Sequence, residues 1–354
     1  MNSKLTKAFS AVLAGAMSLT LLAGCGGAAK TDAGSSSKAE GGAAAKPAKT
    51  VTIKVGSVVA ATHPMNVALR EVFKKTVEEG SNGAIKVELY DSGTLGGEKE
   101  LYDSVRNGNL DICSVGTVMW NEVDKMSIPD WPFLFRDVDH ARKVYTGEIG
   151  AEMAKQLEEV GKVHFLGWGP NGARAFSSNR TINTLEDFKG LRLRMPNNPI
   201  HIQLGSLLGA NVTPMPMGEV FTALEQKVVD GQDNPLATFR NEGWYEVQSD
   251  VFISNHMITS LEMMASDKLW KSLSEDQIKL VQEASLKTCE NAWDLYVASI
   301  DGDTAFLKEN GLKITVPDEA TRAQLVELSQ PIYDDLYKKY DWAEAMVKRI
   351  RDVK

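Results

Sequence analysis

The sequence has 354 residues, and 47 acidic against 39 basic side chains give it a formal net charge of −8 at pH 7. This length suggests about two domains with a sizeable core. The acidic balance argues against a nucleic-acid partner, and three cysteines are too few for a disulfide framework. A site for an anionic ligand would therefore have to be made locally positive by well-placed arginines.

Residues 1–24 are typical of a secretory signal peptide. Two lysines precede an apolar run over residues 8–23, which is too short and too rich in Ala and Gly for a convincing membrane span. The sequence Leu22-Ala23-Gly24-Cys25 resembles a bacterial lipoprotein box, so we expect cleavage before Cys25 and attachment of lipid to its thiol. Residues 25–49 are mainly Gly, Ala, Ser, Lys and Pro, a composition typical of a flexible tether.

The residues after the tether predict a β-α-β-α-β unit. Apolar patterns at 51–56, 85–90 and 110–115 predict strands, and those at 65–79 and 98–107 predict helices. Such a unit implies a parallel sheet, with binding loops after the carboxyl ends of its strands. His63, in the first of these loops, comes just before a proline at a helix start, which favours a capping or turn role over ligand contact.

A Gly-rich stretch in the middle of the chain imitates a nucleotide-binding motif. A buried connector is predicted at 131–135, followed by a helix at 138–161 and a strand at 163–166. Gly167-Trp168-Gly169-Pro170-Asn171-Gly172 then matches G-x-G-x-x-G, but the dinucleotide motif needs a helix to begin within the loop. We predict instead a turn that leads into a strand carrying Arg174, with no nucleotide cofactor.

The stretch after residue 183 has well-marked boundaries. A capping box predicts a short helix over 184–190. Apolar residues at 191, 193 and 195 then alternate with Arg192 and Arg194, which predicts a strand with one buried face and two arginines on the other. Taken alone, this pattern leaves both arginines on a solvated face. A helix start is expected over 197–199.

The remaining elements alternate between helix and strand. Helices are predicted at 200–208, 218–227 and from 318 to the C-terminus, and strands at 211–217, 251–253, 257–266 and 313–316. Val228-Val229 is predicted as a short buried strand that opens into a loop over 230–235, where Asn234 can either cap the backbone or face a cleft. A capping box at Ser274 begins a helix that reaches residue 310 and, at about 50 Å, is long enough to join two domains.

Several ordered motifs resemble the solute-binding subunits of TRAP transporters, the tripartite ATP-independent systems that import organic acids. The resemblance covers the chain from about Val51 to the C-terminal helices. Its most specific motifs are Asn171-Gly172-Ala173-Arg174, Gly190-Leu191-Arg192-Leu193-Arg194-Met195-Pro196-Asn197, Pro214-Met215 with Glu219-Val220-Phe221 and Ala223-Leu224, and Val229-Asp230-Gly231-Gln232-Asp233-Asn234-Pro235.

The resemblance implies an α/β fold of two lobes, like that of periplasmic binding proteins, with the long helix spanning both lobes. We expect lobe I to comprise residues 50–171 plus about 260–299, and lobe II to comprise residues 172–259 plus about 300–354. Cys113 and Cys289 lie in apolar surroundings and are expected to be small core residues.

The resemblance also implies which side chains hold the ligand. In the family, the arginine at the position of Arg194 grips the ligand carboxylate, the position of Arg174 supplies a second guanidinium, and an asparagine at the position of Asn234 orients the same carboxylate. Asn197 and Met217 match positions that contact or floor the ligand. A guanidinium forms two parallel hydrogen bonds to a carboxylate, which a lysine cannot reproduce. The strand pattern alone would not have chosen between its two arginines.

The expected ligand is a small organic acid anion. Sialic-acid-binding members carry an acidic residue at the position of Gly116 and an aromatic residue at that of Met217, so a large amine-bearing or polyhydroxylated ligand loses support. We therefore favour a C4-dicarboxylate or similar carboxylate, with a sugar acid (a uronate or aldonate) as the close alternative. Glu98 could contact a ligand hydroxyl, although a solvated acid at a helix start is its more ordinary role.

The implied function is that of an extracytoplasmic binding protein, lipid-anchored in the periplasm or cell envelope, which closes on the acid and delivers it to membrane permease subunits driven by an ion gradient. An enzyme is the first rival, but the sequence has no H-E-x-x-H, G-x-S-x-G or paired-cysteine metal motif, and its five histidines are scattered. We therefore expect no catalysis, no cofactor and no metal. A binding protein for an ATP-driven importer or a sensor is the second rival, which neighbouring genes would distinguish.

Overall fold

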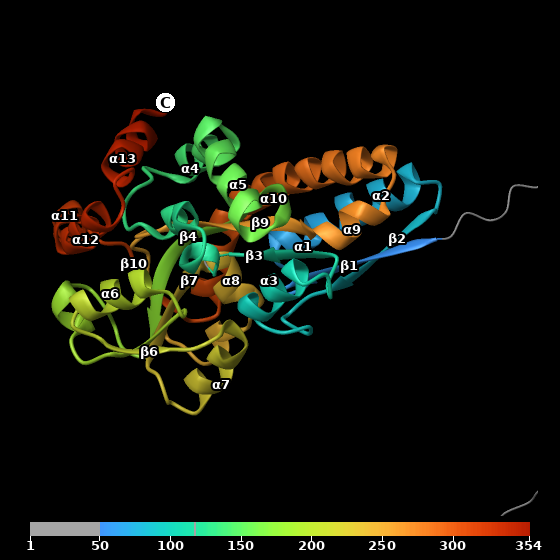
Figure 1. The fold of residues 1–354 in the computed structure, drawn as a ribbon. Coiled ribbons are helices and arrows are strands. Elements are labelled where there is room, and N and C mark those ends of the chain that lie inside the picture. Colours follow the sequence, from blue (N-terminus) through green and yellow to red (C-terminus); the bar gives the residue numbers. More distant parts are fainter. Residues whose placement is uncertain (1–49, 117) are drawn as a thin grey trace, which may run out of the picture. The chain divides into compact units, whose positions relative to one another are not determined.

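The computed structural model describes residues 50–116 and 118–354. The expected signal peptide, Cys25 and the tether lie outside these residues. The described part from residue 50 onward is an α/β fold, in which a mixed sheet is surrounded by helices (Figure 1). The α/β class expected from the sequence is confirmed.

Ten strands of the described residues form the sheet, in the order β2-β1-β3-β9-β4-β7-β5-β6, with β8 pairing with both β4 and β10. Their bounds are β1 Val51–Ser57, β2 Ile85–Tyr90, β3 Ile112–Val115, β4 Val163–Ser178, β5 Arg192–Met195, β6 Asn211–Pro214, β7 Gly231–Pro235, β8 Asp250–Phe252, β9 Ile258–Ser266 and β10 Lys313–Thr315.

The helices follow the pattern expected from the apolar spacing, with breaks described below. Their bounds are α1 Pro64–Ala68, α2 Lys75–Gly80, α3 Glu98–Arg106, α4 Val138–Thr146, α5 Glu148–Gly161, α6 Pro199–Leu207, α7 Val220–Glu225, α8 Leu236–Asn241, α9 Asp267–Ser272, α10 Glu275–Glu309, α11 Glu319–Leu328, α12 Gln330–Lys339 and α13 Ala343–Asp352. Short 3-10 turns occur at Met119–Asn121, Asp124–Asp130, Leu185–Phe188, Met217–Glu219 and Trp244–Glu246, and a π-helical turn at Leu69–Lys74 joins α1 to α2.

The N-terminal β-α-β-α-β unit is confirmed. Strand β1 pairs in parallel with both β2 and β3, as the alternation of strands and helices requires. His63 caps α1, because its Nδ1 accepts a hydrogen bond from the backbone N–H of Met65 (3.2 Å), so the capping role is also confirmed. Cys113 and Cys289 are buried and unpaired, as expected of core residues.

The Gly-rich stretch lies inside one strand, and the turn predicted there is wrong. Strand β4 runs from Val163 to Ser178 with two register shifts against β9. The glycines allow close packing: a Cβ on Gly172, which has φ +125°, would lie 2.4 Å from the ring of Tyr296, and one on Gly167 would lie 2.7 Å from Cys289 Sγ. Because no helix starts in this stretch, the rejection of a dinucleotide motif is confirmed.

Two predicted helices are interrupted. The helix expected over 138–161 is two helices, α4 and α5, because Gly147 between them has an extended backbone. The helix expected from 318 to the C-terminus is three helices, with Pro331 in the first turn of α12, where its missing N–H cannot continue α11.

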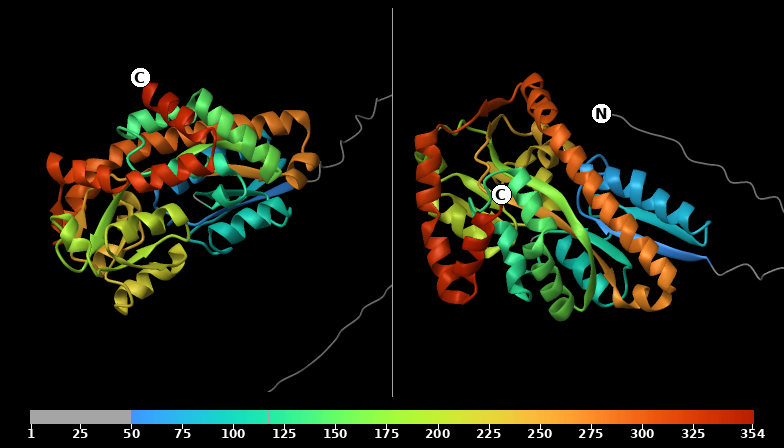
Figure 2. Two further views of the ribbon diagram at one scale, coloured as in Figure 1. Left: turned by 60° about the vertical axis from the view of Figure 1, so that its left-hand side comes forward. Right: turned by 90° about the horizontal axis from the view of Figure 1, so that it is seen from above.

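Strand β4 and helix α10 join the two halves of the sheet. Residues 163–173 of β4 pair with β9, and residues 174–178 pair with β7 and β8. Helix α10 contacts α1 and α2 and also α8 and β10, and Figure 2 shows it in orange beside the blue N-terminal elements. The expected long helix is therefore confirmed, and its capping box at Ser274 is present.

Candidate functional site

A cavity of about 650 Å³ opens beside the end of β5. Arg194, Asn197 and Met217 line it, and Arg194 and Met217 also line an adjoining niche of about 20 Å³ together with Arg174 and Asn234. The structure thus brings together all five residues that the sequence singled out. They come from β4, β5, β7 and the turns after β5 and β6, which lie far apart in the sequence.

Arg194 is a buried cation that pairs with no carboxylate in the part of the chain that the structure describes. Its side chain is 3% exposed, and its Nε and Nη2 donate hydrogen bonds to the backbone carbonyl of Met215 (3.1 and 2.7 Å). Among the described residues, no carboxylate oxygen lies within 4.0 Å of its guanidinium. Burial lowers the pKa of Arg194 to about 10, so it remains charged at neutral pH.

Arg192, two residues earlier on the same strand, has a different environment. It is exposed, and its Nε donates to Asp230 Oδ2 (3.0 Å). A surface ion pair of this kind contributes little to stability, and it occupies the guanidinium that a ligand carboxylate would need. The expectation that both arginines could lie on a solvated face is therefore wrong for Arg194 alone, because the turn carrying Met215 covers the end of β5.

Arg174 is also buried, but Asp233 neutralises it. Its Nε donates to Asp233 Oδ2 (2.7 Å), and its Nη2 donates to the backbone carbonyl of the same residue (2.6 Å). The two residues lie on the paired strands β4 and β7. Burial opposes ionisation of Asp233, but Arg174 and neighbouring histidines hold the pKa of its carboxyl well below the usual range.

The other predicted residues, Asn234, Asn197 and Met217, differ in how deeply they are buried. Asn234 is buried and lines the niche, and its Nδ2 donates to Gln232 Oε1 (2.8 Å). Asn171, also buried, lines the same niche and donates from Nδ2 to Thr259 Oγ1 (3.0 Å). Asn197 is exposed at the cavity mouth, and Met217 is partly buried.

The short strand predicted at Val228-Val229 lies too early in the chain. Strand β7 covers Gly231–Pro235, which the sequence assigned to a loop, and every residue in it is buried. Several of its polar side chains bond to one another or to β4; for example, Gln232 Nε2 donates to Ser177 Oγ (2.9 Å). A polar run therefore forms a central strand, which the preference for apolar strands did not foresee.

A buried cluster behind the niche was missed by sequence reasoning. Asp233 Oδ2 lies 3.3 Å from His256 Nε2 and 3.4 Å from His201 Nδ1, and the other ring nitrogen of His201 lies 2.9 Å from Asp130 Oδ1. These side chains are at most 1% exposed. Two histidines that are scattered in the sequence thus converge on one carboxylate. Of these residues, only Asp233 could have been found from the sequence, because it lies next to Asn234 in a recognised motif.

The rest of the cavity wall carries the acidic side chains of Glu98, Glu100, Glu219 and Glu242 and the basic side chain of Lys99. Glu98 Oε1 accepts a hydrogen bond from the backbone N–H of Gly116 (3.0 Å), and burial raises its pKa. Glu242 Oε1 accepts from the N–H of Ala60 (2.7 Å), and burial raises its pKa to about 7. These groups can accept hydrogen bonds from hydroxyls and would repel a second anionic group.

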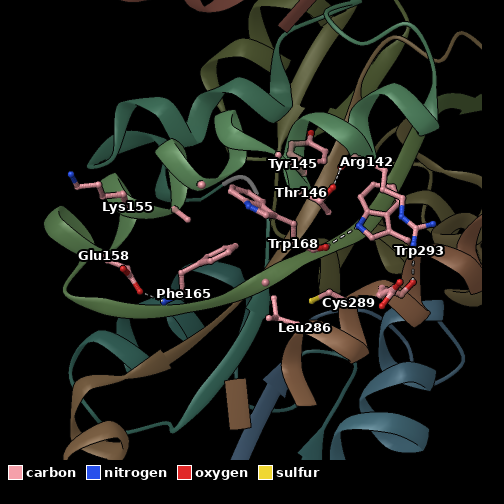
Figure 3. A pocket seen from close by; sticks show the side chains of 15 residues that line it. Arg142, Tyr145, Thr146, Lys155, Glu158, Phe165, Trp168, Leu286, Cys289 and Trp293 are labelled. Atoms are coloured by element: carbon pink, nitrogen blue, oxygen red, sulfur yellow. Dashed lines mark hydrogen bonds between the residues drawn. The ribbon is translucent and has the colours of Figure 1, made fainter. Parts of the chain in front are cut away.

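A second cavity, of about 630 Å³, lies between α4, α5, β4 and α10 (Figure 3). Its wall is mainly aromatic and aliphatic, including Tyr145, Trp168 and Trp293. The arginine at its edge, Arg142, donates from Nη1 to Asp294 Oδ1 (2.7 Å). None of the five predicted residues lines this cavity.

Within residues 50–116 and 118–354, no group of three or more His, Cys, Asp or Glu side chains is arranged to hold a metal ion. In the same part of the chain, no helix combines the length and the apolar character that crossing a membrane requires.

Comparisons with known proteins agree with the fold. Residues 55–340 match the family described as bacterial extracellular solute-binding protein, family 7 (DctP). The sialic acid-binding periplasmic protein SiaP of Vibrio cholerae is 31% identical over 303 residues, which are 84% of this chain and 91% of that protein.

Two solved structures extend the comparison. A TRAP periplasmic solute-binding protein from Haemophilus influenzae with bound L-gulonate is 35% identical, with a TM-score of 0.83 over 86% of this chain and 100% of that one. Another from Sulfurospirillum deleyianum with bound succinate is 29% identical, with a TM-score of 0.81 over 86% of this chain and 99% of that one. This chain is therefore a member of the DctP family of two-lobed TRAP-transporter solute-binding proteins.

Proposed function

We propose that this protein captures a small organic acid, whose carboxylate binds Arg194. The supporting observation is that Arg194, at the junction of the cavity and the niche, is buried, charged and without a carboxylate partner among residues 50–116 and 118–354. Leaving a buried charge unpaired is costly, and an incoming carboxylate removes that cost with bidentate hydrogen bonds. Closure of the lobes is then favoured when the anion is present.

The other predicted residues take secondary roles in this proposal. Arg174 and Asn234 flank the carboxylate in the niche, with Arg174 acting as a donor whose charge is already balanced by Asp233. Asn197 and Met217 contact the part of the ligand that extends into the larger cavity. Each of these contacts contributes less than the one made by Arg194, because a neutral or neutralised donor gains less from an anion.

The charges of the cavity favour a sugar acid over the C4-dicarboxylate preferred from the sequence. Among the described residues that line the cavity, Arg194 supplies the one buried guanidinium, while Glu98, Glu219 and Glu242 place carboxyl groups on the wall. A second carboxylate would face these acids, whereas hydroxyl groups would donate hydrogen bonds to them. Bound L-gulonate in one related structure supports this choice, and bound succinate in another keeps the dicarboxylate as the second candidate.

We further propose that residues 50–171 plus about 260–299 form lobe I, and residues 172–259 plus about 300–354 form lobe II. The pairing of β4 supports a crossing close to Arg174, where its partner changes from β9 to β7. The C-terminal helices also touch lobe I, since Tyr333 Oη donates to the carbonyl of Pro132 (2.7 Å). The hinge would therefore include β4 and α10.

The remaining steps concern delivery. As an extracytoplasmic protein held to the membrane by lipid on Cys25, the closed form would present the acid to the permease subunits of a TRAP transporter, with no chemistry performed on it. Membership of a solute-binding family supports binding without catalysis. Genes for a large and a small membrane subunit beside this gene would support the transporter, and an ATPase gene would support the rival importer.

The test is a calorimetric titration of the parent protein, Arg194→Lys and Arg194→Ala with L-gulonate and succinate. The expected result is binding by the parent, a large loss in both variants, and tighter binding of L-gulonate than of succinate. Equal affinity in all three proteins would contradict the role of Arg194. A thermal-shift screen of organic acids widens the search, because a ligand at 100 times its Kd stabilises the fold by about 2.7 kcal/mol.

A further inference from the structure

Asp130 and His201 form a buried pair that the ligand-binding residues do not include. Asp130 ends the turn Asp124–Asp130, and His201 lies in the first turn of α6, directly after the strand that carries Arg194. Both side chains are fully buried. Asp130 Oδ2 also accepts a hydrogen bond from Nδ2 of Asn198, the N-cap of α6 (2.8 Å), so the pair joins the start of α6 to a segment distant in sequence.

The carboxylates on both sides of the His201 ring favour its cationic form. Its Nε2 lies 2.9 Å from Asp130 Oδ1, and its Nδ1 lies 3.4 Å from Asp233 Oδ2, an ion-pair distance without hydrogen-bond alignment. In a neutral imidazole one nitrogen carries a lone pair, which would then face a carboxylate oxygen. Only the imidazolium presents an N–H to both carboxylates.

The charge of the whole cluster depends on this proton. With His201 charged, two carboxylates, Asp130 and Asp233, are balanced by two cations, Arg174 and His201. With His201 neutral, the cluster carries one net negative charge directly behind the niche, where a ligand carboxylate would be repelled.

We propose that Asp130 and His201 are positioning residues for ligand capture: the His201 imidazolium, held between two aspartates, keeps the buried cluster neutral, so that Arg174 stays on Asp233 and the charge of Arg194 is left for the ligand. This inference rests on the proposed function for its consequence, but the charge state of His201 is testable without any ligand.

Other charged groups around the pair do not replace this cation. His256 faces Asp233 as well, but burial lowers its pKa to about 4, so it is neutral at neutral pH. Glu98 and Glu262 act on Asp130 through space, and burial raises the pKa of each, to about 8 for Glu262. Burial alone would lower the pKa of His201, but the charge and hydrogen bond of Asp130 raise it above the ordinary value.

The binding test is a double-mutant cycle on the full chain, with L-gulonate as the probe. His201→Gln should weaken binding by about tenfold or more, within the usual range of coupling between sites. Asp130→Asn should leave the affinity unchanged or increase it, because it removes a negative charge. The double variant has a neutral cluster again and should return to within about threefold of the parent.

A merely structural role gives a different pattern. Loss of packing or of α6 anchoring would make the double variant as weak as His201→Gln or weaker, and that result would overturn the proposal. The matched control is His164→Gln, which removes the histidine of a partly exposed pair with Asp267 (3.5 Å) and should not change the affinity.

Nuclear magnetic resonance of the ligand-free parent protein tests the charge directly. The imidazole nitrogens of His201, assigned in the parent through their covalent connection to the backbone, should both be protonated at pH 7, while those of His256 should show one protonated nitrogen. A neutral His201 at pH 7 overturns the proposal even if the variants fail to fold. Absence of L-gulonate and succinate binding by the parent, with a charged His201, would instead count against the proposed function.

Discussion

The two large cavities of this protein have nearly the same volume, about 650 and about 630 Å³, but their charged side chains are arranged differently. In the cavity beside β5, Arg194 is buried, and no carboxylate of the described residues pairs with it. In the aromatic cavity of Figure 3, Arg142 is paired with Asp294 and the wall is mostly apolar. Volume therefore does not identify the site of an anionic ligand, whereas an unpaired buried charge does.

The largest expected effect is a difference in ligand affinity between substitutions of Arg194 and Arg142. Arg194→Ala should weaken binding of L-gulonate by at least about a hundredfold, because truncating one partner of a buried charge pair costs about 2–5 kcal/mol. Arg142→Ala in the other cavity should change the affinity by less than about twofold, since its pair with Asp294 is partly exposed. Isothermal titration calorimetry of the two variants checks both values, and equal losses would remove the distinction between the cavities.

The second effect concerns the protonation of Glu262, a buried carboxyl group beside the aromatic residues of β4. Glu262 is buried opposite Trp168 on the neighbouring strand, and burial raises its pKa to about 8. The folded state therefore binds a proton that the unfolded state releases above about pH 4.5, so stability should fall as the pH rises from there to about 8.

Glu262→Gln removes this dependence. We expect its free energy of unfolding at pH 8 to exceed that of the parent by more than about 1 kcal/mol, given about 1.4 kcal/mol for each unit of pKa shift. At pH 4.5 the two proteins should differ little. Urea denaturation at both pH values measures this, and a parent stability that rises from pH 5 to 8 while the variant stays flat would contradict the assignment.

A smaller effect tests the acidic wall of the ligand cavity. Glu98→Gln should lower the ratio of L-gulonate to succinate affinity by about tenfold, because it replaces an acceptor for hydroxyls and removes a charge that repels the second carboxylate. The ratio is the useful quantity, since loss of a negative charge strengthens binding of any anion. An unchanged ratio would mean that the ligand does not reach this glutamate.

The smallest effect lies in the aromatic cavity. Trp293 Nε1 donates a hydrogen bond to the carbonyl of Trp168 (2.8 Å), so Trp293→Phe should cost about 1 kcal/mol of stability by leaving that carbonyl unpaired. Its affinity for L-gulonate should match that of the parent. A marked loss of affinity would couple the two cavities through β4 and α10.

Local signals in the sequence predicted much of the fold. The β-α-β-α-β unit depends on apolar spacing within each element, and the capping boxes at Thr184 and Ser274 depend on residues three positions apart, so both are legible in the chain. The break at Gly147 and the strand at Gly231–Pro235 are not, because tertiary packing, and not local propensity, decides them.

The candidate site was predicted only in part, for a related reason. Alternation put Arg192 and Arg194 on one face of β5, and the resemblance to a family, not the pattern, chose between them. The structure distinguishes them through the turn at Met215, which covers Arg194 alone. The pairing of Asp130 with His201 could not be predicted from the sequence, because the two residues are 71 positions apart in the chain.

The most direct test of the account is a crystal structure of the protein with L-gulonate bound. We expect both carboxylate oxygens within hydrogen-bonding distance of the Arg194 guanidinium, with the amide of Asn234 beside them and the hydroxyl groups directed toward Glu98. A carboxylate found elsewhere, in the aromatic cavity or in bulk solvent with the Arg194 guanidinium unoccupied, would contradict it.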